Sequence, residues 1–405
     1  MAPDQEESVG MKGPMRGVKI VDLSIALAGP WAVTMLADQG ASVVKVEPPG
    51  LGDIGRWVGV RVGGISAMAA MVNRGKRSIA VDLRQDEGRT IVEQLVREAD
   101  VFVQNFRPGV IEKLGLSYDV LRAVNPDLVY CSISGFGPEG PYAQKSAYDP
   151  VVQAYGGLAS AQAGGVDREP QLIRHTAADK ITALNAAQAI SAALFARERG
   201  GGGQHLHLSM LESVVNFVWA DAAGNEVLLE SDGSAPSSFA RDQKLWPTKD
   251  GYVIAAPVSD ADVAGICKGV GVDGYDAPEV ATILARRSNP DAFTALLRRV
   301  MAAVRELTTA EAIAGMEAES APCGAVLSPA ELGDDPHARA IGMLEDLVHP
   351  LAGRMRQPRP AARFAGTPSQ SGPPAPGLGE HTDEILAELG LGERVAELRS
   401  AGVVS

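Results

Sequence analysis

Short apolar runs alternate with amphipathic stretches through the first third of the chain. Each run is brief and bounded by polar or glycine positions, which favours buried strands, and each longer stretch repeats its apolar positions with a helical period. We predict strands at residues 18–24, 42–49, 77–83, 100–106 and 128–134, with helices at 29–40, 87–99 and 118–126. Strands and helices that alternate in this way are typical of an α/β fold with a parallel sheet covered on both faces.

The pattern changes in the second half. A glycine turn at residues 200–203 leads into a further strand, and residues 211–229 have the pattern of a helix. A Ser/Gly/Pro-rich link at 230–243 precedes a hairpin expected around Lys249, Asp250 and Gly251, and helical segments follow from 260 to 318. Residues 354–382 form a Pro/Gly-rich strap. The tail is helical, with Ile385, Leu386 and Leu389 on one face.

A chain of 405 residues exceeds what one compact core usually holds, so two domains are expected. We predict a disordered N-terminal extension at 1–14 and a large domain at 15–224. A small α+β domain follows at 225–330. The segment 331–405 returns as a strap and C-terminal helices that complete the large domain.

Composition narrows the range of partners and compartments. The formal charge of −13 argues against nucleic acid as the main partner, although a local basic patch can still hold a small phosphorylated ligand. No apolar run reaches the roughly 20 residues of a membrane span, and residues 1–17 lack the apolar core of a signal peptide. Cys131, Cys267 and Cys323 lie far apart, with neither disulfide nor metal-ligand spacing. We therefore expect a soluble protein of the reducing cytoplasm, without membrane contact.

Two familiar ligand motifs are absent or misplaced. The first strand is followed by "SIALAGPW" instead of a G-x-G-x-x-G turn, which argues against a nicotinamide-dependent oxidoreductase. The glycines at 200–203 end a helix and precede a strand, the reverse of the order in a phosphate loop. His205 and His207 alternate on a strand without a further ligand pattern, so we expect no zinc site there.

Cations gather around two neighbouring strands. Ligands of open α/β sheets bind beyond the carboxyl ends of strands, and cations in such loops suit phosphate or pyrophosphate. A solvated charged surface explains the same composition, and both explanations stay open on these residues alone: Arg74, Lys76, Arg77, Arg84, Arg107 and Lys113.

One acid stands immediately before a long and almost uncharged helical pattern. Asp179 precedes Ile181, Leu184 and the alanine-rich stretch that follows them. It is either a helix N-cap or a carboxylate held at the positive end of a helix in order to react. In either role we expect it to stay ionised at pH 7, because an unperturbed aspartate has a pKa of about 3.9.

Several phrases together resemble the class III coenzyme A (CoA) transferases, which include formyl-CoA, carnitine and succinyl-CoA:acid CoA-transferases and the related α-methylacyl-CoA racemases. They occur in family order from about Met15 onward. The matching phrases are "VKIVDLSIALAGPWAVTMLADQGASVVKVEPPGLGD", "NRGKRSIAVDL", "ADVFVQNFRPGVIEKLGLSYDVLRAVNPDLVYCSISGFGPEGP", "AYDPVVQAYGG", "RERGGGGQHLHLSML" and "APGLGEHTDEILAELG".

The resemblance implies a fold and a reaction. The fold is a Rossmann-like large domain plus a small α+β domain, with two chains interlocked as rings in a homodimer. The reaction moves CoA from an acyl-CoA to a small carboxylic acid through aspartyl–acyl anhydride and aspartyl-CoA intermediates, with no metal and no permanently bound cofactor. Asp179 matches the family's nucleophile, at the expected distance beyond Tyr148 and Asp149. Asp149 is expected to orient Tyr148 or the acyl group.

The resemblance also implies CoA contacts, position by position. Leu27 departs from the family, because formyl-CoA transferases carry a glutamine there, which puts formyl and oxalate specificity in doubt. Pro48 stands where some members have an adenine-contacting arginine. The matching positions are Ile25, Ala26, Ala28, Val81, Arg84, Asn105, Phe106, Lys113 and Leu114.

Two alternatives share this fold. An α-methylacyl-CoA racemase needs an acid/base pair across the α-carbon, normally a histidine working with the aspartate. Tyr148 stands at that histidine position, and a phenol has an unperturbed pKa of about 10, so the racemase is disfavoured. A non-catalytic CoA-binding subunit of a heteromeric transferase is the other alternative, and the presence of Asp179 argues against it.

Overall fold

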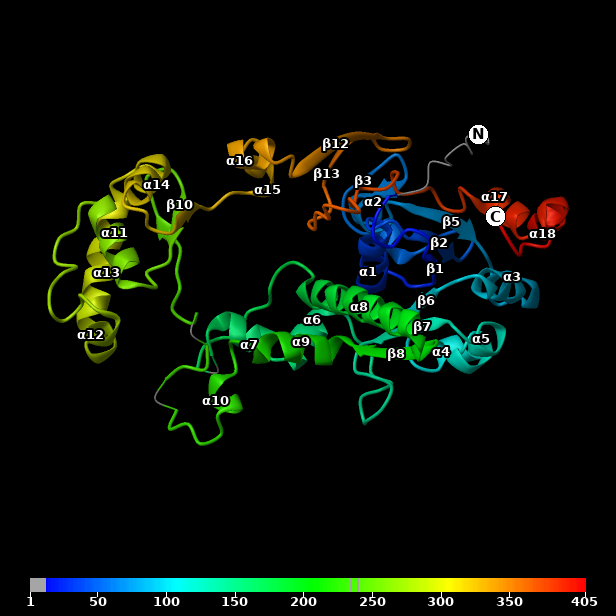
Figure 1. Cartoon of the computed structure of the whole chain (residues 1–405), viewed down its shortest axis with the longest axis horizontal. Helices are drawn as coiled ribbons and strands as arrows, with labels where there is room; N and C mark the ends of the chain where they lie inside the picture. The colour runs from blue at the N-terminus through cyan, green and yellow to red at the C-terminus, as the bar shows by residue number, and fades with distance from the viewer. Residues whose placement is uncertain (1–11, 166, 234, 239) are drawn as a thin grey trace. The chain divides into compact units, whose positions relative to one another are not determined.

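The computed structural model of the chain describes residues 12–165, 167–233, 235–238 and 240–405 (Figure 1). Residues 1–11 of the predicted N-terminal extension lie outside the described residues. The chain forms two compact units. One comprises residues up to Arg241 together with Gly342–Ser405, and the other is Asp242–Ile341.

The second unit starts and ends later than the predicted small domain at 225–330. Residues before Asp242 stay with the first unit, where Arg241 pairs with Asp167 at 2.6 Å and its carbonyl accepts from Arg168 at 3.2 Å. At the other end, the two short helices α15 (Pro329–Leu332) and α16 (Pro336–Ala340) belong to the second unit, so the returning strap begins near Gly342.

Six parallel strands form the sheet of the first unit, which confirms the predicted α/β class. Their spatial order is β5-β2-β1-β6-β7-β8, which is the 3-2-1-4-5-6 order of a Rossmann fold when the six are counted along the chain. The strands are β1 (Lys19–Asp22), β2 (Ser42–Glu47), β5 (Lys76–Ala80), β6 (Val101–Gln104), β7 (Val129–Ser134) and β8 (Gln204–Ser209).

Helices cover both faces of this sheet, because successive residues of the strands are apolar and point to opposite sides. Ile20 packs with one layer of helices and Val21 with the other. The first layer is α1 (Ala28–Ala37), α6 (Asp149–Tyr155), α7 (Leu158–Ala163), α8 (Ala177–Ala196) and α9 (Met210–Trp219).

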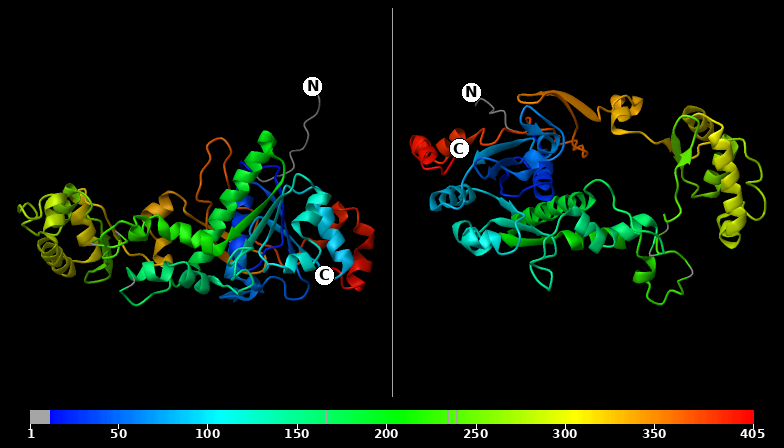
Figure 2. Two further views of the ribbon diagram at one scale, coloured as in Figure 1. Left: turned by 90° about the horizontal axis from the view of Figure 1, so that it is seen from below. Right: turned by 180° about the vertical axis from the view of Figure 1, so that it is seen from behind.

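The second layer joins early and late parts of the chain (Figure 2). Its helices are α3 (Asp86–Arg97), α4 (Val110–Lys113), α5 (Tyr118–Val124), α17 (Thr382–Glu388) and α18 (Val395–Ser400), with the short 3-10 turn η3 (Gly392–Arg394) between the last two. Ile385 and Leu386 are fully buried and Leu389 packs beside them, which confirms the predicted apolar face of the tail. Beyond α18, Val404 pairs with Val81 at the end of β5.

Several elements of the first unit were missed from the sequence. The predicted helix at 211–229 breaks after Trp219 and resumes as α10 (Gly224–Val227). The start of the predicted strap is instead a hairpin of β12 (Leu344–His349) and β13 (Gly353–Pro358), in which Gly353 takes the positive φ that the turn requires. The helices α4, α6 and α7 were not predicted either. The remaining unpredicted elements of the described first unit are η1 (Ile54–Trp57), β3 (Arg61–Val62), β4 (Ile65–Ser66), α2 (Ala67–Val72) and the π-type turn η2 (Arg197–Gly201).

The second unit has its own core around a small antiparallel sheet. The predicted hairpin is present, since β9 (Trp246–Pro247) pairs with β10 (Tyr252–Ala255), and β11 (Cys323–Ala325) lies on the other side of β10. The helices packed with it are α11 (Asp260–Gly269), α13 (Pro290–Arg305) and α14 (Thr309–Ala318), and the short α12 (Ile283–Ser288) directly precedes α13. This is the α+β composition that the sequence predicted.

Candidate active site

The strand order changes direction between β1 and β6, and loops from these two strands meet there. Such a switch point is where open α/β sheets bind ligands. Asn105, just after β6, accepts the backbone N–H of Ile25 at 2.7 Å and donates its amide to the Ile25 carbonyl at 2.8 Å. The two loops that carry Ile25, Ala26, Asn105 and Phe106 are therefore fixed to each other.

The first of these loops is held in a strained conformation. Ala26 has a φ of 64°, in the left-handed region that non-glycine residues rarely adopt. The buried carboxylate of Asp53 accepts the N–H of Ala26 at 2.8 Å and that of Gly55 at 2.9 Å. Lys45 lies 3.2 Å from Asp53 and also donates to the Ser24 carbonyl. These bonds offset the strain and give the loop one shape.

Buried charges lie directly beneath the loop. The ammonium of Lys76 is 2.8 Å from Asp22, and both side chains are fully buried, as is Lys45. Burial lowers the pKa of Lys76 to about 8 even though Asp22 is its neighbour. Lys45 and Lys76 thus neutralise acids inside the protein. Lys76 was one of the cations that could have bound a phosphate. Its burial excludes that role, because a ligand in solvent cannot reach its ammonium group.

Asp179 lies in the first turn of α8. The helix starts at Ala177 with Thr176 at the N-cap, so Asp179 is the third helical residue and the N-cap alternative was wrong. Its own N–H donates to Oδ2 of Asp149 at 2.9 Å. Because this N–H belongs to the first turn, it has no carbonyl partner within the helix, and Asp149 satisfies it from another segment.

Asp149 is locked in place by the neighbouring glutamine. Gln153, one turn later in α6, donates to Oδ1 of Asp149 at 2.5 Å. The same amide accepts from the Ile173 N–H at 2.9 Å and donates to the Ile173 carbonyl at 3.1 Å. Asp149 is 5% exposed. It is therefore a buried acceptor that fixes the start of α8, whereas the side chain of Tyr148 beside it points into solvent and is 72% exposed.

The ionisation of Asp179 differs from the prediction. Burial, and next the negative charge of Asp149, raise the pKa of Asp179 to about 7, against a smaller opposing effect of Lys180. The expectation of a fully ionised carboxylate at pH 7 was wrong, because burial and the charge of Asp149, thirty positions earlier in the chain, both disfavour the ionised form. An acid poised near neutrality in the first turn of a helix has the attributes of a reactive group.

The remaining residues that were expected to contact CoA lie in different places and differ in exposure. Ala28 starts α1, next to the first loop, and Lys113 and Leu114 lie at the end of α4, which follows β6. Val81 is fully buried beneath Val404, so its side chain does not face solvent. The side chain of Arg84 is 86% exposed and pairs with Asp82 at 2.8 Å.

Sequence reasoning missed Lys45, Asp53 and Gln153. Lys45 sits in the middle of the apolar strand "SVVKVE", and a cation in such a place needs a buried acid as its partner. That pattern was available in the sequence. The partner itself and the role of Gln153 depend on how distant segments pack, so no local pattern identifies them.

The family model described as "CoA-transferase family III" matches residues 15–382. The chain belongs to CoA-transferase family III.

Relatives of this family III CoA-transferase match it over nearly its full length. A protein of Agrobacterium fabrum named succinate–glutarate CoA-transferase is 35% identical over 399 residues, covering 95% of this chain and 98% of its own. The human succinyl-CoA:glutarate CoA-transferase is 33% identical, covering 96% of this chain and 90% of its own. The crystal structure of a CaiB/BaiF family protein from Brucella suis superimposes with a TM-score of 0.80 at 34% identity, covering 94% of this chain and all of that one.

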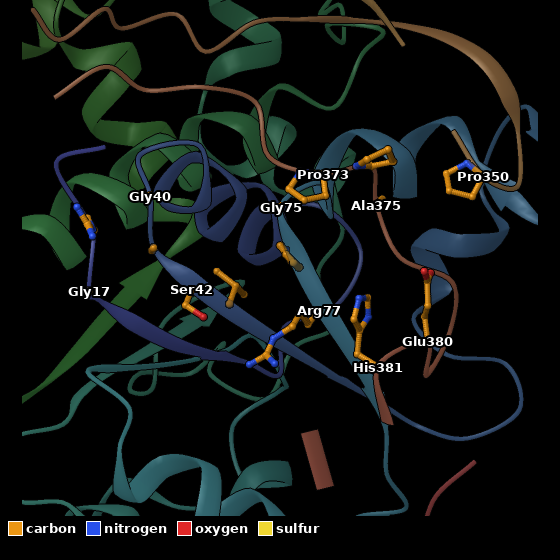
Figure 3. Close-up of a pocket in the computed structure, with 15 residues that line it drawn as sticks. Gly17, Gly40, Ser42, Gly75, Arg77, Pro350, Pro373, Ala375, Glu380 and His381 are labelled. Carbon is orange, nitrogen blue, oxygen red and sulfur yellow. The ribbon is translucent and has the colours of Figure 1, made fainter. Parts of the chain in front are cut away.

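Two of the hollows in the described residues of the first unit differ in place and character. One, of about 560 Å³, is bounded by Leu27 at the end of the first loop and by Lys180, the residue after Asp179. The other, of about 470 Å³, lies at the amino ends of β2 and β5, with Arg77 and His381 on its wall (Figure 3). The second hollow is thus at the opposite end of these strands from the loops of the switch point.

Neither a metal site nor a membrane span was found in the described residues. No group of three or more His, Cys, Asp or Glu side chains there is placed to hold a metal ion. No helix in that part of the chain has the length and apolar character needed to cross a membrane.

Proposed function

We propose that this family III CoA-transferase moves CoA from an acyl-CoA to a free carboxylic acid, with Asp179 as the covalent nucleophile. The observation that carries the proposal is the position of Asp179 in the first turn of α8, with its pKa raised to about 7 by burial and by Asp149. A carboxylate with a raised pKa is a stronger nucleophile than a solvated aspartate, and part of it is ionised at neutral pH.

The reaction proceeds in four balanced steps. A carboxylate oxygen of Asp179 attacks the thioester carbonyl carbon, and the C–S bond breaks. The CoA thiolate departs, and the acyl group remains on Asp179 as an aspartyl–acyl anhydride. The thiolate attacks the aspartyl carbonyl of this anhydride, which gives an aspartyl-CoA thioester and releases the donor acid. The acceptor carboxylate then attacks the aspartyl-CoA and displaces the thiolate. Finally, the thiolate attacks the acceptor's acyl carbon, which releases the new acyl-CoA and restores Asp179.

The site supports these steps in two ways. The backbone N–H groups at the start of α8 form a positive helix end, which favours the carboxylate by about 0.3–1 kcal/mol and also favours negative charge that develops beside it. The fixed loops at Ile25 and Asn105 offer a rigid seat for the CoA portion. Holding the thiolate beside the anhydride is worth about 7–11 kcal/mol, because the return step becomes intramolecular.

Hydroxylamine trapping tests the covalent intermediate. The enzyme is incubated with an acyl-CoA donor and hydroxylamine, and the peptides are then mapped by mass spectrometry. We expect a hydroxamate on the peptide that carries Asp179, together with loss of activity, and no modification when free CoA replaces acyl-CoA. A hydroxamate on Asp149 would transfer the nucleophile role to that residue.

We further propose that the acids are small dicarboxylic acids. The relatives that match nearly the whole chain are named for succinate and glutarate. Leu27, at the end of the first loop, is 7% exposed. Its side chain makes that position apolar. A screen of acyl-CoA donors against free acids, read by mass spectrometry, identifies the pair.

The racemase alternative has a direct test. Proton exchange at the α-carbon needs two acid/base groups on opposite faces, whereas Tyr148 is 72% exposed and makes no hydrogen bond with Asp179 in the described part of the chain. In deuterated water, 2-methylacyl-CoA is expected to gain little α-deuterium while an added acid receives CoA. Rapid deuterium uptake without transfer to any acid would favour the racemase. Binding of CoA without either activity would favour a non-catalytic subunit.

We also propose that the enzyme acts in the cytoplasm as an interlocked homodimer. Its three cysteines are free thiols, as expected in a reducing compartment. Large apolar side chains of α8 and α9 remain exposed in the single chain, including Phe195 at 65% and Phe217 at 55%. Exposed apolar patches of this kind mark subunit interfaces. Light scattering after size-exclusion chromatography is expected to give twice the mass of the 42.2 kDa chain.

A further inference from the structure

The hollow beside Leu27 and Lys180 has mostly apolar walls. Trp31 and Met35 of α1 form one side, and Met68 and Met71 of α2 form another. Methionine side chains are flexible and polarizable, so they adapt to apolar groups of different shape. A hollow of about 560 Å³ is within the size range of small-molecule sites.

Two residues connect this hollow to the proposed reaction centre. Leu27 ends the loop whose Ile25 and Ala26 are fixed at the switch point, and Lys180 directly follows Asp179 in α8. Leu27 and Lys180 thus bring one end of this hollow to the first loop and to the first turns of α8, where Asp179 lies.

The charges around the hollow are unbalanced. Arg74 and Asp38 neutralise each other through two bonds, of 3.0 and 2.7 Å. Arg359, in the strap just after β13, has no carboxylate within ion-pair distance in the described part of the chain. The NH1 group of Arg359 donates only to the Pro360 carbonyl, at 2.8 Å, and its Nε is buried without a hydrogen-bond partner among the described residues. A guanidinium without an acid partner is available to bind an anion.

We propose that this hollow binds the non-reacting part of a dicarboxylic acyl group, with the far carboxylate on Arg359. The methylene chain lies against Trp31 and the methionines, and the reacting carboxyl group is directed to Asp179. The inference rests on the proposed transferase function and adds to it the residue that selects dicarboxylic over monocarboxylic acids. Arg359 suits this role because its planar guanidinium binds a carboxylate through two parallel hydrogen bonds.

The test compares matched acids in the purified full-length enzyme. Values of kcat/KM are measured for glutarate and for valerate, which have the same chain length but differ in the far carboxylate, with one fixed acyl-CoA donor. Arg359→Met is expected to lower kcat/KM for glutarate about 30- to 300-fold and to change that for valerate by less than about threefold. Arg354→Met, on the exposed side of the same hairpin, serves as the control and is expected to leave both values unchanged.

A binding measurement separates this inference from the transferase proposal. Glutarate alone is expected to raise the melting temperature of wild-type enzyme and of Arg354→Met, and not that of Arg359→Met, whereas valerate is expected to raise none of them appreciably. Equal losses for glutarate and valerate in Arg359→Met, or an unchanged glutarate response, would overturn the role of Arg359 while leaving CoA transfer intact. Absence of transfer to any acid in wild type, with the glutarate shift still present, would overturn the transferase proposal alone.

Discussion

The backbone N–H of Asp179 donates to the carboxylate of Asp149 at 2.9 Å, so one acid holds the other in place and also disfavours its charge. The hydrogen bond fixes the first turn of α8, and the negative charge of Asp149 adds to burial in raising the pKa of Asp179. The side chain of Asp149 therefore contributes both to the position and to the ionisation of the proposed nucleophile.

Replacing Asp179 by Asn is expected to abolish CoA transfer, with a loss of at least about 10³-fold in kcat, because an amide cannot form the anhydride. The fold is expected to remain, since the Asp149 bond uses the backbone of residue 179. Steady-state kinetics and circular dichroism check both points. An Asn variant that keeps more than a few per cent of wild-type turnover, with deamidation excluded by mass spectrometry, would contradict the covalent role.

The pH profile of kcat/KM is expected to have an acid limb near pH 7. Below that pH Asp179 in the free enzyme becomes protonated and loses its nucleophilic form. Asp149→Asn removes the nearby negative charge while burial remains, so the limb is expected to move to lower pH but to stay above the ordinary aspartate range. The exposed Glu139→Gln variant is the control and is expected to keep the wild-type limb. A limb that stays in place in Asp149→Asn would argue against the charge effect.

Asp179→Asn is also expected to change stability in a pH-dependent way. The pKa of Asp179 is higher in the folded than in the unfolded chain, so the folded state binds more protons between about pH 4 and 7. Wild-type stability therefore falls as the pH rises through this window and is constant above it. The Asn variant avoids the cost of a buried negative charge at residue 179. At pH 8 its free energy of unfolding is expected to exceed that of the wild type by about 1–2 kcal/mol, a value reduced to allow for the partial exposure of the site. Denaturant unfolding at pH 8 and pH 4 measures the difference, which is expected to vanish at pH 4.

Asn105→Ala is expected to raise KM for the acyl-CoA about tenfold. The substitution removes both bonds to Ile25 and frees a loop that includes the strained Ala26. Asn125→Ala is the matched control, because the side-chain amide of Asn125 also bonds only to backbone, away from the switch point: it donates to the Val96 and Ala99 carbonyls and accepts the Asp127 N–H. Both variants are expected to lose similar stability. An equal rise in KM in the two would show that the effect is only structural.

The parallel sheet could be predicted because its strands are apolar on both faces and are separated by amphipathic helices. Ile20 and Val21 illustrate this pattern, since neighbouring residues enter different cores. The hairpin of β12 and β13 was missed because its strands alternate charged and apolar residues, such as Arg354, Met355 and Arg356, within a region rich in proline.

The candidate site was only partly accessible from sequence. The position of Asp179 near a helix start follows from local pattern, and its role as a nucleophile rests on the family resemblance. Its raised pKa does not follow from local pattern, because it depends on Asp149, which packs against α8 from an earlier helix. The proposed role of Arg359 could not be predicted from local sequence at all, since the hollow that it lines is built by α1, α2 and α8, which lie far away in the chain.

The edge of the sheet at β5 is completed by residues made much later in synthesis. Val404 pairs with Val81, and the side chain of Gln85 donates to the Gly402 carbonyl across a separation of 317 residues. Until those later residues have left the ribosome, Val81 and its neighbours in the second core have no cover from them. The nascent first unit therefore exposes an apolar edge over a long stretch of synthesis, which makes it a substrate for chaperones that bind apolar segments.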